Sequence, residues 1–169
     1  KAVTPVNIHS VIGSKAFNDQ GSVVLGTAAG GRKITLYNLN GLNPSSPSID
    51  FLNEWFFKTM HHEFAHILHQ TKNYSTDFNL ISTDYQGPSW LNLESDAVAN
   101  KMGYVTCYAS YSPDEDFVEI ISNYVTHAKG YWESVLATAG EEGGDKLARK
   151  FEIVRNYLQE SWGIDIDKL

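Results

Sequence analysis

Hydrophobic and polar residues alternate over much of the first forty positions. Residues 3–12 alternate loosely, residues 23–25 are a short apolar run, and residues 33–40 alternate well, so these three segments predict β-strands. The Gly-rich segment 26–31 between the last two fits neither phosphate-binding glycine fingerprint, and it predicts a hairpin turn. We therefore expect a small, mostly antiparallel sheet at the start of the chain.

The pattern becomes helical at residue 49. Apolar residues then recur at spacings of three and four as far as Leu68, which predicts a helix over residues 49–71. Residues 41–48 and 72–92 are rich in turn-forming residues. A short helix is expected over residues 94–102, where Gly103 ends it, and another over residues 113–127. Two more are expected over residues 131–138 and 144–161, and the glycine-rich segment 140–144 separates them. A sheet followed by packed helices predicts an α+β fold.

Composition narrows the class of protein. The chain has 169 residues, of which 42% are hydrophobic, and this predicts a single globular domain over residues 1–169. A net charge of −7 argues against a nucleic-acid partner. Cys107 is the only cysteine, which excludes a Cys-rich zinc site. No apolar run approaches the roughly 20 residues of a membrane span. The chain opens at Lys1 without Met, so we expect an N-terminal truncation.

The sequence His62-Glu63-Phe64-Ala65-His66 carries the strongest chemical signal. Four residues of helix rotate by about 400°, so His62 and His66 lie only about 40° apart, one turn above the other. Two imidazoles in this arrangement can bind one tetrahedral Zn²⁺. Glu63 is rotated toward the open side of the metal, where a carboxylate can act as general base on a water molecule.

A third ligand must come from elsewhere in the chain. In metzincins it is a His ten residues after the first, but Lys72 occupies that position and excludes the subclass. His69 shares the face of His62, yet it lies about 10 Å further along the helix axis. We therefore expect His69 to orient a ligand or to line the pocket.

The acidic segment 112–119 offers the better ligand. Glu115 and Glu119 share a helix face, so Glu115 can bind zinc while Glu119 hydrogen-bonds a ligand histidine. Ser112 and Glu115 also have capping-box spacing, so Glu115 can instead serve only as a helix cap. Asp116 and Glu119 remain the alternative ligands.

Three segments together resemble a known family. HHEFAHILHQ, YASYSPDEDFVE and GSVVLGTAAGGRKITLY are similar to the zinc-binding metallopeptidases of Bacteroidetes, also described as substrate-import-associated zinc metallohydrolase lipoproteins. The resemblance runs from about Val11 to Tyr124. It implies a gluzincin-like zincin fold with a central HExxH helix. It also implies a lipid-anchored, periplasmic or extracellular location on the cell envelope and an association with outer-membrane nutrient uptake.

The resemblance adds two expectations about the site. Some gluzincins place a Tyr seven residues before the third ligand, which corresponds to Tyr108, where a hydroxyl can stabilise an oxyanion; Tyr111 is the rival, and simple aromatic packing is the alternative. The strand over residues 33–40 precedes the active-site helix as the edge strand does in zincins. An extended peptide could pair with it, which favours a peptide substrate by fold analogy.

The sequence thus predicts a monomeric zinc metallopeptidase. His62, His66 and Glu115 bind Zn²⁺, Glu63 is the general base, and Tyr108 stabilises the oxyanion. Two alternatives remain open: a zinc hydrolase that acts on peptidoglycan or glycoprotein amides, and a non-catalytic zinc-containing module of an outer-membrane uptake complex.

Overall fold

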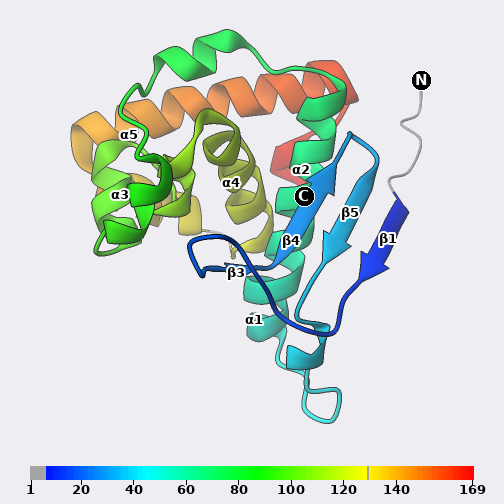
Figure 1. The fold of residues 1–169 in the computed structure, drawn as a ribbon. Helices are drawn as coiled ribbons and strands as arrows, with labels where there is room; N and C mark the ends of the chain where they lie inside the picture. The colour runs from blue at the N-terminus through cyan, green and yellow to red at the C-terminus, as the bar shows by residue number, and fades with distance from the viewer. Residues whose placement is uncertain (1–6, 129) are drawn as a thin grey trace. The chain divides into compact units, whose positions relative to one another are not determined.

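The computed structural model describes residues 7–128 and 130–169 (Figure 1), and the chain divides into two compact units between Asn73 and Tyr74. The first unit contains the strands and the helix with the HExxH sequence, and the second contains the remaining helices. The predicted α+β class is confirmed. The predicted single domain over residues 1–169 stays a prediction.

The first unit contains a three-stranded sheet and a two-stranded ribbon. In the sheet, β5 (Lys33–Leu36) runs parallel to β1 (Asn7–Val11) and antiparallel to β4 (Gly26–Ala29), in the order β1-β5-β4. The ribbon pairs β2 (Ala16–Phe17) with β3 (Val23–Val24) in antiparallel fashion. The mostly antiparallel pairing agrees with the prediction. Residues 3–6 of the predicted first strand lie outside the described residues.

One expectation about the strands is wrong, and another is right except for its bounds. β5 has a neighbour on each side, so the segment 33–40 does not form the edge strand, and β4 takes that place. The predicted hairpin turn is present between the antiparallel strands β4 and β5, but it is confined to Gly30 and Gly31, whose φ angles are 58° and 64°, because residues 26–29 form a strand. Residues 26–29 form a strand because of tertiary packing. Ala28 packs against the buried cluster of Ile34, Leu36 and Ile67, the last of which belongs to the helix over residues 58–71.

The predicted helix over residues 49–71 is confirmed in three parts. It consists of α1 (Ile49–Leu52), a π-helical turn (Asn53–Phe57) and α2 (Lys58–Thr71). The Ser48 hydroxyl accepts a hydrogen bond of 3.3 Å from the Phe51 amide and caps the start. α2 packs against β4 and β5.

The described part of the second unit consists mainly of α-helices joined by short turns. The helices are α3 (Asp96–Met102), α4 (Pro113–Thr126) and α5 (Tyr131–Tyr157). The shorter elements of the chain are the 3₁₀ turns Leu39–Gly41, Thr76–Leu80, Gly87–Asn92, Tyr108–Tyr111 and Ile166–Lys168 and the π-helical turn Leu158–Trp162. Gly103 ends α3 with a φ of 95°, as the sequence predicts. Among the described helices, none has the length and hydrophobicity that a membrane crossing requires.

The two helices expected over residues 131–138 and 144–161 are both present within α5, where a kink separates them. The interruption is confined to Gly140, whose φ and ψ of 71° and −165° are not helical. The rest of the glycine-rich segment is helical because α3 lies against it: a Cβ atom on Gly143 would overlap the carbonyl oxygen of Asn100 and lie 2.8 Å from that of Lys101. Gly143 is therefore required by packing and does not break the helix.

This close approach predicts that Gly143→Ala destabilises the protein, by about 1–3 kcal/mol, because the added methyl group overpacks the contact between α3 and α5. Gly144→Ala is the matched control, since its Cβ would lie 3.5 Å from the nearest atom, the Leu136 carbonyl oxygen. An alanine there is expected to be neutral or to stabilise the helix by up to about 1 kcal/mol. Thermal unfolding of the two variants checks this, and equal melting temperatures would contradict it.

Candidate metal centre

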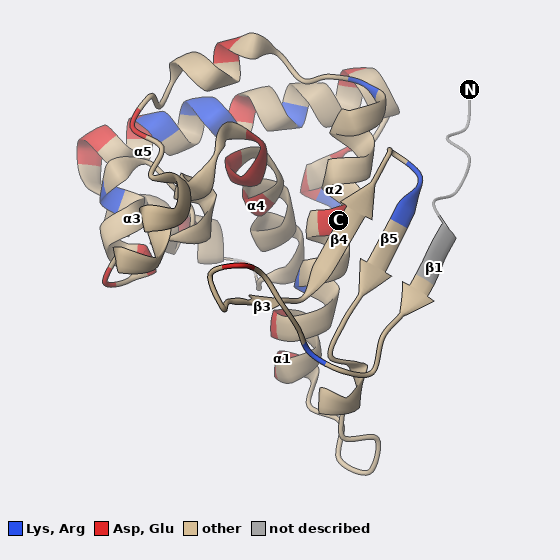
Figure 2. Cartoon of the chain, in the orientation of Figure 1, with Lys and Arg blue, Asp and Glu red and all other residues tan. Residues whose placement is uncertain are grey.

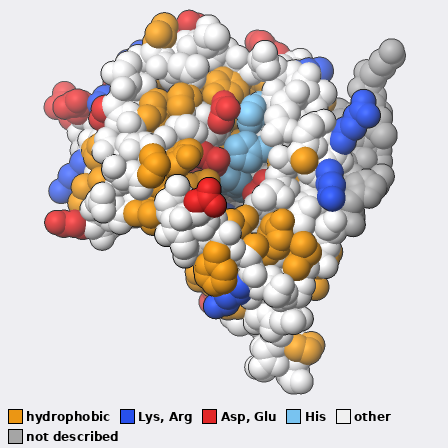
Figure 3. All heavy atoms as spheres, viewed as in Figure 1, with side chains coloured by type: hydrophobic (Ala, Val, Ile, Leu, Met, Phe, Trp, Pro, Cys, Tyr) orange, Lys and Arg blue, Asp and Glu red, His pale blue; other side chains and the backbone are white. Residues whose placement is uncertain are grey.

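Helix α2 places two histidine rings against each other. His62 and His66 are one turn apart, and their ring centroids lie 4.9 Å from each other with the ring planes at 74°. His62 is buried and His66 is half-buried. Histidine side chains are visible at the surface in Figure 3. The prediction that His62 and His66 lie on one face of the helix, one turn apart, is therefore confirmed.

His69 continues the row of histidines by one more turn. Its Nε2 atom lies 2.9 Å from Nδ1 of His66, a hydrogen bond in which one of the two nitrogens carries the proton. When His66 Nδ1 donates, His66 Nε2 is deprotonated, which is the state that a metal requires. His69 thus contacts a candidate ligand, as expected of an orienting residue.

Glu63 lies against strand β4. Its carboxyl group is buried, and a Cβ atom on Gly26 would lie 2.7 Å from Glu63 Cγ and 2.8 Å from both Glu63 Oε1 and Thr59 Cγ2. Gly26 therefore leaves the space that the Glu63 side chain occupies. Sequence reasoning missed this role; a glycine inside a strand is the signal that could have indicated a close approach.

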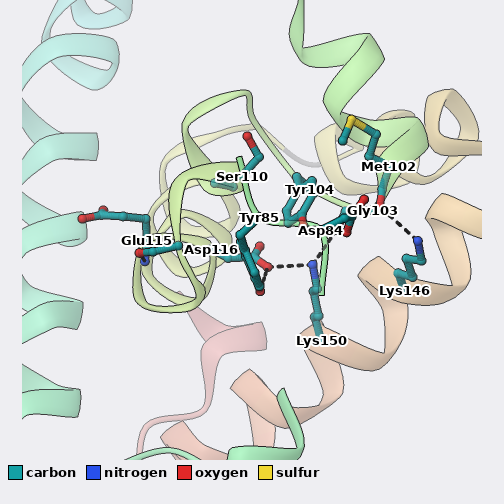
Figure 4. A network of polar contacts seen from close by, with 12 residues as sticks. Asp84, Tyr85, Met102, Gly103, Tyr104, Ser110, Glu115, Asp116, Lys146 and Lys150 are labelled. Atoms are coloured by element: carbon teal, nitrogen blue, oxygen red, sulfur yellow. Dashed lines mark hydrogen bonds and ion pairs between the residues drawn. The ribbon is translucent and has the colours of Figure 1, made fainter. Parts of the chain in front are cut away.

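In the second unit, acidic residues gather at the start of α4 (Figure 2). The Ser112 hydroxyl accepts a hydrogen bond of 3.3 Å from the backbone amide of Glu115, so the capping interaction exists. It uses the amide of Glu115 and not its carboxylate. The Glu115 side chain is half-buried and points away from the polar network around Asp116 (Figure 4).

Asp116 is held inside the second unit. Its carboxylate is fully buried, lies 2.6 Å from Lys150 Nζ and accepts a hydrogen bond of 2.8 Å from the Tyr85 hydroxyl. Burial raises the pKa of Asp116 to about 6, although Lys150 and Tyr85 act in the opposite direction. These contacts use the Asp116 carboxylate within its own unit, which disfavours it as the third ligand.

Glu119 is also buried and is fixed by two donors. Thr106 Oγ1 donates to Glu119 Oε2 at 2.7 Å, and Asn123 Nδ2 donates to the same oxygen at 3.2 Å. Both donors bind one oxygen of the carboxylate, so the orientation of Glu119 is set by its neighbours. A carboxylate held in this way suits an orienting role better than that of a ligand.

Tyr108 belongs to an aromatic cluster. Its ring centroid lies 5.0 Å from that of Trp90 and 6.0 Å from that of Tyr111. Tyr108 is half-buried and Tyr111 is exposed. The aromatic packing expected at this turn is present, and the oxyanion role of either hydroxyl stays a prediction.

The donor atoms of the chain fit a zinc ion. The ligands that the sequence predicts are His62 and His66 in the first unit and Glu115 in the second, and each offers one ligand atom of a type that zinc binds. Two imidazole nitrogens and one carboxylate oxygen are a donor set that catalytic zinc sites use, with the fourth position left for water or substrate.

Two comparisons with known proteins agree with this chemistry. The model of a family described as "Putative zinc-binding metallo-peptidase" matches residues 1–167. The crystal structure of a protein from Bacteroides caccae, described in the same words, is 37% identical, with a TM-score of 0.71. The match covers 92% of this chain and 56% of that protein, so this chain spans just over half its length. No curated protein matches the chain. Because the family model spans nearly all of its residues, this chain belongs to that family of zinc-binding metallopeptidases.

Proposed function

We propose that this protein is a zinc-dependent peptidase. The observation that carries the proposal is the pair of histidine rings on α2, 4.9 Å apart, with the buried carboxylate of Glu63 on the same two turns of helix. A structural pair of histidines has no need of a carboxylate between them, whereas hydrolysis of a peptide bond requires a base.

The proposed ligands are His62, His66 and Glu115. The contact between His66 Nδ1 and His69 Nε2 occupies one ring nitrogen of His66 and leaves Nε2 as its ligand atom. Of the three candidate carboxylates, Asp116 is paired with Lys150, and Glu119 accepts two hydrogen bonds within its unit. The Glu115 carboxylate points away from that polar network, which supports it as the third ligand (Figure 4).

When bound, a zinc ion supplies a Lewis acid that makes a water molecule more acidic and polarises the carbonyl group under attack. Glu63 accepts the proton of the attacking water and returns it to the leaving amine. Gly26 allows the Glu63 carboxylate to lie beside strand β4. Glu119 orients a ligand histidine, and the Tyr108 hydroxyl stabilises the oxyanion.

The proposed substrate is an extended peptide. Within the described sheet β4 pairs only with β5, so β4 has an open edge whose backbone groups could pair with a peptide. β4 is also the strand that Glu63 touches, so a peptide bound there lies near the base. Activity assays with peptides, peptidoglycan fragments and glycopeptides separate this proposal from amide hydrolysis on the cell wall or on glycoproteins.

The cellular setting is a separate proposal that rests on the sequence resemblance. We propose that the protein is a monomer that acts at the cell envelope, alongside outer-membrane nutrient uptake. Fractionation of the cells that produce it tests the location, and sedimentation of the purified protein tests the monomer. A non-catalytic uptake module would bind zinc but hydrolyse none of the substrates above.

We expect Glu63→Gln to retain zinc and to lose hydrolysis by about a hundredfold or more, because the amide cannot accept the proton of the water. Zinc content and peptide hydrolysis are measured on the same preparation. Glu54→Gln, an exposed position in the preceding π-helical turn, is the control and should match the parent in both. Near-parental activity of Glu63→Gln would exclude Glu63 as the base.

Ser112→Ala and Glu115→Ala separate a cap from a ligand. Ser112→Ala removes the hydroxyl that caps α4 and should cost roughly 1 kcal/mol of stability while one zinc per chain remains bound. Glu115→Ala should lower zinc affinity sharply, because one of three protein ligands is lost. Zinc titration and thermal melts check both. If Glu115→Ala binds zinc as Ser112→Ala does, Glu115 is only part of the cap.

His69→Ala should weaken zinc binding by about 10 to 100-fold, because His66 loses the group that orients its ring. His69→Gln should recover part of that loss, since its amide oxygen can accept the hydrogen bond of His66 Nδ1. Competition with a chelator of known affinity measures both variants. Equal zinc affinity in the parent and His69→Ala would show that the contact does not orient the ligand.

A further inference from the structure

A buried ion pair lies directly beside Glu115. Asp116 and Lys150 have fully buried side chains, and Lys150 Nζ lies 2.6 Å from Asp116 Oδ2 (Figure 4). The Tyr85 hydroxyl donates to the same carboxylate oxygen at 2.8 Å, and Lys150 Nζ donates to the Gly103 carbonyl at 2.7 Å. The pair thus connects α4 and α5 with the end of α3 and with the segment that precedes α3.

A second layer of contacts fixes Lys150. Its ammonium group lies 4.3 Å from the centroid of the Tyr104 ring, whose hydroxyl donates to Asp84 at 2.9 Å. Asn100 Nδ2 donates to the carbonyl oxygens of Tyr104 and Val105, both at 2.9 Å, which holds the loop after α3 in place. Lys150 is therefore held by charge, by an aromatic face and by a backbone carbonyl.

Stability is a weak explanation for this pair. Burial lowers the pKa of Lys150 and raises that of Asp116, so removal from water disfavours both charged forms. Apolar side chains of similar volume often stabilise a protein as well as a buried ion pair does, or better. What an ion pair adds is direction, because its charge-assisted contact forms only over a narrow range of geometries.

The orientation of Asp116 restricts the orientation of the neighbouring residue, Glu115. Asp116 follows Glu115, and consecutive helical residues are rotated by about 100°. When Asp116 is held toward Lys150, the Glu115 side chain must leave α4 on another side, and in Figure 4 it points away from the whole network. The Ser112 cap fixes the start of the same turn.

We propose that the buried Asp116–Lys150 pair is a positioning device that sets the rotation of the first turn of α4 and so aims the Glu115 carboxylate at the metal. The inference rests on the proposed function, in which Glu115 is the third ligand. Asp116 and Lys150 act through Glu115 and do not touch the metal themselves.

The test replaces the pair with apolar side chains in the double variant Asp116→Leu/Lys150→Met. The readouts are zinc affinity, from competition with a chelator, and the visible spectrum of the Co²⁺-loaded protein, which reports the ligands and their geometry. We expect zinc binding about tenfold or more weaker, at the low end of the range for groups that orient ligands, and an altered Co²⁺ spectrum.

Val154→Ala is the matched control for a general loss of packing, since Val154 is fully buried in α5. It should lower the melting temperature and leave zinc affinity and the Co²⁺ spectrum as in the parent. Equal loss of zinc affinity in Val154→Ala would overturn the inference, because any weakening of the core would then suffice. Parental zinc affinity in the double variant would overturn it too.

Asp116→Asn keeps the shape of the side chain and gives a second measurement should the double variant not fold. It should also weaken zinc binding, and an unchanged affinity would overturn the inference. Glu115→Ala separates the ligand role of Glu115 from the positioning role of the ion pair. If Glu115→Ala loses zinc while the double variant Asp116→Leu/Lys150→Met keeps it, only the positioning role fails. If Glu115→Ala retains parental zinc affinity, the ligand assignment fails and the positioning role fails with it.

Discussion

Helix α2 lies so close to strand β4 that any side chain at Gly26 would overlap Glu63. The apolar side of the helix, with Ile67 in the buried cluster, packs on the sheet and fixes the rotation of the helix about its axis. The helical repeat places His62 and His66 on one face. The fixed rotation decides that Glu63 contacts the strand. Burial of apolar surface therefore decides where the polar groups of this helix point.

The second unit orients its acidic helix by different means. The first turn of α4 is set by a hydroxyl cap from Ser112 and by the buried contact of Asp116 with Lys150. Glu119, one turn later, accepts hydrogen bonds from Thr106 and from Asn123. Directional polar contacts thus hold the carboxylates of Asp116 and Glu119, and a backbone cap holds the start of the helix.

The family of this chain is established, whereas its peptidase activity and the roles of individual residues are proposals from geometry. The chain matches the family model over residues 1–167 and spans 56% of the related Bacteroides protein. The donor set of two histidines and one glutamate, the buried Glu63 and the open edge of β4 are consistent with a peptidase. All of the residues that form these features lie within this chain.

Local patterns in the sequence were enough to predict the helices and the histidine pair. Apolar residues at spacings of three and four and the cap at Ser48 define α1 to α2, and the helical repeat alone brings His62 and His66 to one face. The Ser112 cap and the end of α3 at Gly103 were equally readable, because these signals act over a few neighbouring residues.

Contacts between residues far apart in the chain were decided only by the tertiary structure. The segment that begins at Gly26 reads as a turn, but packing beneath α2 makes it an edge strand, and Gly143 reads as a helix breaker until α3 lies against it. The partner of Asp116 is Lys150, 34 residues away, and no local pattern announces it. Helical periodicity determines which residues share a face; packing and buried charge determine what that face meets, since those energies depend on the whole fold.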